Sequence, residues 1–191
     1  MKIPKGQAGY IPARKKKLLL YTALEFGAVA LFLITGYLKT HTRLNLFTLF
    51  AVLLALPASK MLVELIAIAP YKTIDPAIAE EIEDKAELLT RAYDLIITST
   101  ERAMQVDAVV ISNRTVFGYT GNSRTDTAEV SGHIRGMLEE NHIKGTTVKV
   151  FHEYNHFLSR AEGLNNIIGV NHSADRELES SIRNILLHIS M

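Results

Sequence analysis

Apolar residues are concentrated in the first seventy positions of the chain, in two long runs separated by a short polar link. The first run, 18–38, reads LLLYTALEFGAVALFLITGYL and contains one ionisable residue, Glu25. The second run covers about 45–67. At a rise of about 1.5 Å per residue, each run can span the roughly 30 Å of a bilayer core. Because neither run has the polar stripe of a soluble amphipathic helix, the pattern predicts two transmembrane helices.

The link between the runs, residues 39–43, is so short that it can join only antiparallel neighbours, and we expect a helical hairpin over 18–70. The preceding tail, 1–17, carries more lysine and arginine than the link does. The more basic side of a membrane protein stays in the cytoplasm. The pattern therefore predicts a multi-pass protein of the cell membrane whose N- and C-termini are both cytoplasmic.

Ionisable residues in and beside the hairpin suggest further contacts. In a hairpin closed by residues 39–43, Glu25 lies within about one helical turn of Lys60. Because a charge near the membrane centre costs a few kcal/mol, we expect these two residues to pair and hold the hairpin together, with subunit assembly as the second interpretation. Lys15, Lys16 and Lys17 precede the first run and suit contact with anionic lipid.

From residue 71 onward the sequence is polar and patterned like a small α/β domain. Asp75 and Pro76 mark the start of a helix whose apolar spacing extends to Tyr93. Runs rich in β-branched and aromatic residues predict strands over 93–100, 106–112, 115–121 and 146–151. Helices are expected over 126–142, 156–164 and 173–190, the last capped by Ser173. The order predicts a small mixed sheet flanked by helices, over 71–191.

Composition narrows the possible functions. The chain contains no cysteine, which excludes disulfides and thiolate metal sites. Its net charge of +1 provides no strong field toward nucleic acid, so nucleic acid is a possible partner that the charge does not support.

Residues 105–122, QVDAVVISNRTVFGYTGN, resemble the core of the nuclease-related domain of the NERD family, which has the PD-(D/E)xK nuclease fold. Gln105 and Asp107 match the opening of the family pattern, and the order of helices and strands agrees. The resemblance implies that Asp107 would hold a divalent ion that activates water. This chain has Thr120 and Asn122 where the family has its catalytic Glu and Lys. The resemblance therefore supports the fold and argues against nuclease activity.

A second motif, His152-Glu153-Tyr154-Asn155-His156, matches the H-E-x-x-H pattern of zinc peptidases. In those enzymes both histidines bind zinc and the glutamate activates the zinc-bound water. The strand expected over 146–151 runs directly into His152, so a helix containing the whole motif is not assured. A third ligand is also needed, for which the chain offers Glu177 or Glu179 near an expected helix start that looks exposed.

The competing interpretation of the same segment is an ordinary amphipathic helix. Tyr154, Phe157 and Ala161 fall on one face at helical spacing, which leaves His152 and His156 on the other face toward water. On this interpretation the chain has no cofactor; on the peptidase interpretation the cofactor is zinc.

The sequence thus predicts a membrane-anchored cytoplasmic module that binds a protein partner or a second copy of itself, besides the lipid bilayer, and that is not an enzyme. A membrane-bound zinc peptidase using His152, Glu153 and His156 is the alternative. A metal-dependent nuclease centred on Asp107 is the second alternative. The whole chain is similar to small bacterial two-span membrane proteins, a similarity of architecture that implies no chemistry.

Overall fold

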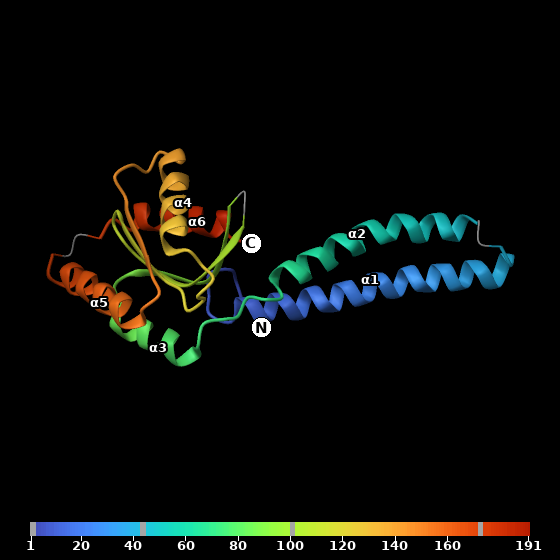
Figure 1. Ribbon diagram of the computed structural model, residues 1–191, viewed down its shortest axis with the longest axis horizontal. Coiled ribbons are helices and arrows are strands. Elements are labelled where there is room, and N and C mark those ends of the chain that lie inside the picture. The colour runs from blue at the N-terminus through green and yellow to red at the C-terminus, as the bar shows by residue number, and fades with distance from the viewer. Residues whose placement is uncertain (1–2, 43–44, 100–101, 172–173) are drawn as a thin grey trace. The chain divides into compact units, whose positions relative to one another are not determined.

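The computed structural model describes residues 3–42, 45–99, 102–171 and 174–191, which form two compact units (Figure 1). One unit is the helical hairpin Ile11–Tyr71. The other is an α/β domain that combines Lys72–Met191 with the described residues of Met1–Tyr10. The basic tail expected over 1–17 is therefore divided: its first part packs with the α/β domain, and the remainder belongs to the first helix.

The hairpin consists of α1 (Tyr10–Thr40) and α2 (Leu46–Ile68), which contain the two apolar runs. Both helices are long and apolar enough to cross a membrane, and only 11% of the residues in the most apolar 18-residue stretch of each helix are buried. Most of the large apolar side chains that the described residues expose lie on these two helices. This exposure distinguishes them from the core helices of a soluble protein. α2 continues without interruption through Pro57.

Contacts within the hairpin differ from the predicted ones. The ion pair that joins the helices is formed by Arg14 and Glu64, and the described residues include no ion pair between Glu25 and Lys60. Lys15 Nζ donates hydrogen bonds to the carbonyl oxygens of Ala69 and Tyr71, 2.6 Å away in each case, just beyond α2. Cations are favoured at the C-terminal end of a helix. Part of the predicted lipid-facing cluster thus binds the hairpin itself.

The α/β domain contains one sheet with the strand order β1-β2-β3-β4. Its strands are β1 (Thr90–Thr98), β2 (Ala103–Ser112), β3 (Thr115–Tyr119) and β4 (Thr147–Phe151). β1, β2 and β3 form an antiparallel meander, and β4 pairs with β3 in parallel after a crossover through α4 (Thr127–Glu140). The sheet is mixed, as the sequence predicts. The tight β2–β3 turn places Asn113 at φ 50°, a conformation that asparagine tolerates.

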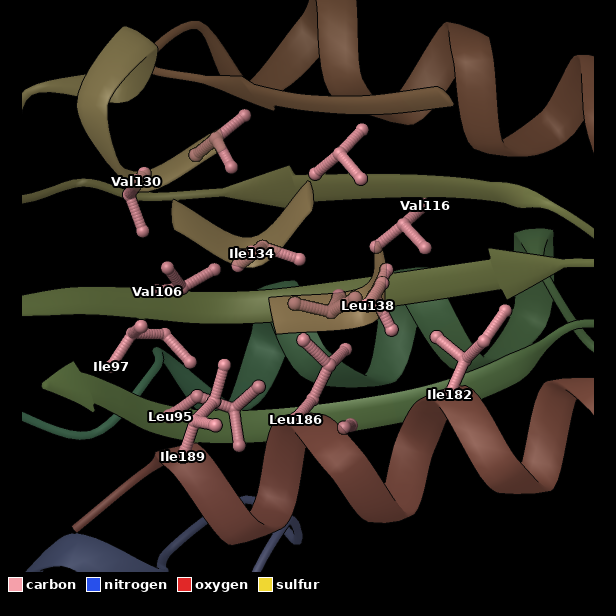
Figure 2. Close-up of a cluster of buried hydrophobic side chains, with 14 of the residues drawn as sticks. Leu95, Ile97, Val106, Val116, Val130, Ile134, Leu138, Ile182, Leu186 and Ile189 are labelled. Carbon is pink, nitrogen blue, oxygen red and sulfur yellow. The ribbon is translucent and has the colours of Figure 1, made fainter. Parts of the chain in front are cut away.

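Helices cover both faces of the sheet, which explains why β1 and β2 are buried along almost their whole length. α4 and α6 (Arg176–Ile189) pack on one face; Figure 2 shows Val130, Ile134 and Leu138 of α4 and Ile182 and Leu186 of α6 against the strands. On the other face, α3 (Pro76–Lys85) and α5 (Tyr154–Asn171) form a second core.

The ends of α3, α5 and α6 differ from those that the sequence predicts. α3 begins as expected, with Asp75 accepting a hydrogen bond from the Ala77 amide, but it ends at Lys85. Tyr93 therefore belongs to β1, where pairing with β2 replaces the expected helical turn. α5 is twice as long as the nine residues expected. α6 is capped by Asp175, whose side chain accepts from the Leu178 amide, and Ser173 lies outside the described residues.

The two faces of α5 predict opposite effects of mutation. Phe157 is fully buried, whereas the side chain of His156 is 72% exposed. We expect Phe157→Ala to lower the free energy of unfolding by about 3–5 kcal/mol, because it removes a buried ring and leaves a cavity. His156→Ala should change it by no more than about 0.5 kcal/mol. Thermal or urea unfolding of the full chain in detergent, followed by circular dichroism, measures both; similar losses would contradict this assignment of faces.

Candidate functional site

Two aspartates lie opposite each other at an irregularity in the pairing of β1 with β2. Asp94 of β1 and Asp107 of β2 lie between the regular pairs Tyr93↔Ala108 and Leu95↔Val106. Asp94 has φ 54°. Before Asp94 the even-numbered Ala92 faces the core under α4 and α6, whereas after it the odd-numbered Leu95 faces that core, so the alternation of side chains is shifted by one residue. The same change of phase occurs at Asp107. Both acids are consequently buried, at 1% and 7% exposure.

The carboxylate of Asp94 is held by donors from the chain that follows the hairpin. Thr73 Oγ1 donates to Asp94 Oδ2 at 2.7 Å, and the Ile74 amide donates to Oδ1 at 3.0 Å. The Gly9 amide in turn donates to Thr73 Oγ1 at 3.0 Å. The stretch of chain before α1 and the stretch after α2 are thus joined to each other and to β1.

Asp107, the candidate from the nuclease resemblance, also accepts hydrogen bonds at both oxygens. The Gly121 amide donates to Oδ2 at 2.6 Å, and Gln105 Nε2 donates to Oδ1 and to the Lys72 carbonyl. Burial raises the pKa of Asp107, these two donors oppose the shift, and the charge of Asp94 adds to it. Thr120, at the position of the family's catalytic Glu, is fully buried. Asp107 therefore fastens the loop after β3 to β2.

The residues of the H-E-x-x-H motif are divided between a loop and a helix. His152 and Glu153 precede α5, which begins at Tyr154. His152 Nδ1 lies 3.3 Å from the Thr120 carbonyl oxygen, while His156 Nδ1 lies 3.2 Å from Glu153 Oε2 at an exposed position. In the described ranges, no group of three or more histidine, aspartate or glutamate side chains is placed to hold a metal ion.

Glu179, named above as a possible third zinc ligand, is fully buried rather than exposed. Its carboxylate accepts hydrogen bonds from Thr90 Oγ1 at 2.8 Å, the Asn113 amide at 2.9 Å and Arg176 Nη1 at 3.0 Å. It thereby attaches the start of α6 to β1 and to the β2–β3 turn. The position within the first turn of a helix suggested exposure, and only the tertiary contacts reveal the burial.

A groove of about 480 Å³ lies along the edge of β1, and no pattern in the sequence indicates it. Its lining comes from four separate stretches of the domain: Gly6, Gln7, Ala8, Glu83, Leu89, Arg91, Tyr93 and Arg183. The Gly6 carbonyl accepts a hydrogen bond from the Tyr93 amide at 3.0 Å, which holds the first stretch against β1. Gly6 has φ +85°, and a Cβ there would lie 2.7 Å from Leu187 Cδ2, so only glycine fits.

The polar groups of the groove are partly held and partly unsatisfied. Arg91 Nη1 donates to the Glu83 and Ala86 carbonyls, at 3.2 and 2.7 Å, and so terminates α3. Arg183 Nε donates to the Arg91 carbonyl at 3.0 Å. The Tyr93 hydroxyl is buried without a hydrogen-bond partner. Burial raises the pKa of Tyr93 to about 12, with Arg91 opposing and Glu83 adding to the shift.

The raised pKa of Asp107 predicts the pH dependence of stability. Just above pH 3.8 the carboxyl of Asp107 is still protonated in the folded state but has lost its proton in the unfolded state. The contribution of Asp107 to the free energy of unfolding therefore falls as pH rises from 3.8 to its raised pKa in the folded protein. The free energy of unfolding of the wild type, minus that of Asp107→Asn, should therefore decrease as pH rises from about 4 and then level off. Unfolding of the full chain in detergent at several pH values measures it. A difference that increases with pH would show a lowered pKa instead.

No protein-family model matches the chain, and no curated protein or solved structure is significantly similar to it. The likeness of 105–122 to the NERD family therefore stays a prediction from the motif, while the mixed sheet flanked by helices is what the structure shows.

Proposed function

We propose that this protein is a membrane-anchored binding module: the hairpin inserts in the cell membrane from the cytoplasmic side, and the α/β domain binds a ligand or partner without catalysing a reaction. The observation that carries the proposal is the exposure of the two long apolar helices: only 11% of the most apolar stretch of α1, and 11% of that of α2, is buried. Apolar side chains exposed over this length favour insertion in a bilayer.

The buried acids support a binding role over a hydrolytic one. Asp94, Asp107 and Glu179 all accept hydrogen bonds from the protein that fix strands, loops and helices. A hydrolytic metal site needs several carboxylate or imidazole groups directed at one point, with an open position for water. The groove at β1, in contrast, combines charged groups with a hydroxyl that has no partner, which is typical of a binding site.

Membrane topology is tested by single cysteines, since the chain has no native cysteine to interfere. Thr42→Cys lies in the link between α1 and α2, and Glu140→Cys lies on the exposed end of α4. In intact cells a membrane-impermeant maleimide should label Thr42→Cys, whereas Glu140→Cys should react only after permeabilisation. Labelling of Glu140→Cys in intact cells would contradict the proposed orientation, and release of the protein by alkaline carbonate would contradict insertion.

The peptidase alternative is tested by metal analysis. We expect the purified full chain and the double variant His152→Ala/His156→Ala to contain the same amount of zinc, because only His156 of the two histidines lies on α5. Elemental analysis after dialysis measures the content. About one zinc per chain in the wild type, lost in the variant, would favour the peptidase.

A further inference from the structure

We propose that the groove along β1 binds a phosphate group whose organic substituent carries hydroxyl or ammonium donors. This inference names a ligand class for the binding module proposed above and rests on that proposal. The groove is formed within the α/β domain by Gly6–Ala8, the end of α3, β1 and α6. It is separate from Asp107 and from the H-E-x-x-H motif.

The charges of the groove favour an anion. Arg91 and Arg183 supply two positive charges against the single negative charge of Glu83. Guanidinium groups match the geometry of phosphate oxygens and bind them with paired hydrogen bonds. Both side chains are already positioned, because Arg91 Nη1 is bound to the end of α3 and Arg183 Nε to the Arg91 carbonyl. A guanidinium has five N–H donors, so each arginine keeps donors for a ligand.

The remaining groups select the substituent on the phosphate. Glu83 contributes a carboxylate, which only accepts hydrogen bonds, so a ligand atom near it must be a donor such as a hydroxyl or an ammonium group. The Tyr93 hydroxyl is more than nine-tenths buried and has no partner within the protein. It remains protonated at neutral pH. Because protein atoms cover the hydroxyl, a neighbouring side chain must shift before the hydroxyl can bond to a ligand in the groove. A volume of about 480 Å³ exceeds what a bare phosphate needs.

Two sources can supply such a ligand: a phospholipid headgroup and a soluble phosphorylated metabolite. One stretch of the groove lining, Gly6–Ala8, ends shortly before α1 begins at Tyr10 in the sequence. Phosphatidylglycerol and phosphatidylethanolamine have hydroxyl or ammonium donors. Phosphatidylcholine has a phosphate and no N–H or O–H donor, so it serves as the control lipid.

The experiment compares the full chain with three variants in nanodiscs. Arg183→Gln removes one guanidinium of the groove, and Tyr93→Phe removes only the hydroxyl. Arg160→Gln, at an exposed position on α5, changes the net charge by the same amount as Arg183→Gln and serves as the matched control. In the soluble arm, phosphatidylcholine discs are titrated with glycerol 1-phosphate, and binding is measured by isothermal calorimetry. In the lipid arm, the midpoint of thermal unfolding is compared between pure phosphatidylcholine discs and discs that contain phosphatidylglycerol or phosphatidylethanolamine.

We expect phosphatidylglycerol or phosphatidylethanolamine to raise the unfolding midpoint of the wild type and of Arg160→Gln, since a ligand that binds only the folded state stabilises it. Arg183→Gln should lose this increase. Tyr93→Phe should reduce it while leaving the midpoint in phosphatidylcholine unchanged or higher, because the hydroxyl has no partner in the protein. A response to glycerol 1-phosphate that Arg183→Gln weakens at least tenfold, without a response to lipid, would support the site and assign it to a soluble ligand.

Three results would overturn the inference. The first is no response of the wild type in either arm. The second is an equal loss in Arg183→Gln and Arg160→Gln, which would indicate unspecific attraction by charge. The third is a response to lipid or to glycerol 1-phosphate that neither of the single variants, Arg183→Gln and Tyr93→Phe, diminishes. Cysteine labelling and carbonate extraction decide separately whether the protein is anchored, so failure of the phosphate site leaves the proposed anchoring and its test intact.

Discussion

The carboxylate of Asp94 binds the stretch of chain after the hairpin directly and the stretch before the hairpin through Thr73. It accepts hydrogen bonds from Thr73 and Ile74, and through Thr73 it also fixes Gly9. A carboxyl group that is 1% exposed is costly to bury unless hydrogen bonds satisfy it, so these contacts are needed once the sheet has placed Asp94 there. The first stretch of chain then lies along β1, where Gly6 binds the Tyr93 amide and forms one wall of the groove.

Buried polar groups in the domain fall into two kinds. Asp107 and Glu179 have donors at both carboxylate oxygens, and each connects elements that are distant in sequence. Removing one partner from such a group leaves an unsatisfied charge, so these acids stabilise the arrangement of the elements. The Tyr93 hydroxyl is the opposite case, a buried group that the protein itself leaves without a partner. The domain thus uses its acids for structure, while the hydroxyl of Tyr93, a residue of the groove lining, stays without a partner.

Patterns local in sequence predicted most of the fold and little of the site. The apolar runs predicted both long helices, and runs rich in β-branched and aromatic residues predicted all four strands. Tyr93 fits both the helical spacing that includes Ile82 and the start of the strand predicted over 93–100, and pairing with β2 decides for the strand. Glu179 looked exposed because the first turn of a helix usually is. The groove residues share no motif, so their proximity exists only after folding.

The covering of β1 has a consequence for biosynthesis. Its free edge is occupied by Gly6 through the Tyr93 amide and by Ser190, which bridges to Ile97 and accepts a hydrogen bond from Lys5. Lys5 and Ser190 are separated by 185 positions in the sequence, so the part of the edge that Ser190 covers stays open until Ser190 has been synthesised. Contacts of such long range form slowly, and an open strand edge invites pairing with another chain. Early insertion of the hairpin would separate nascent chains from one another during that interval, so the membrane would also limit aggregation before the sheet is complete.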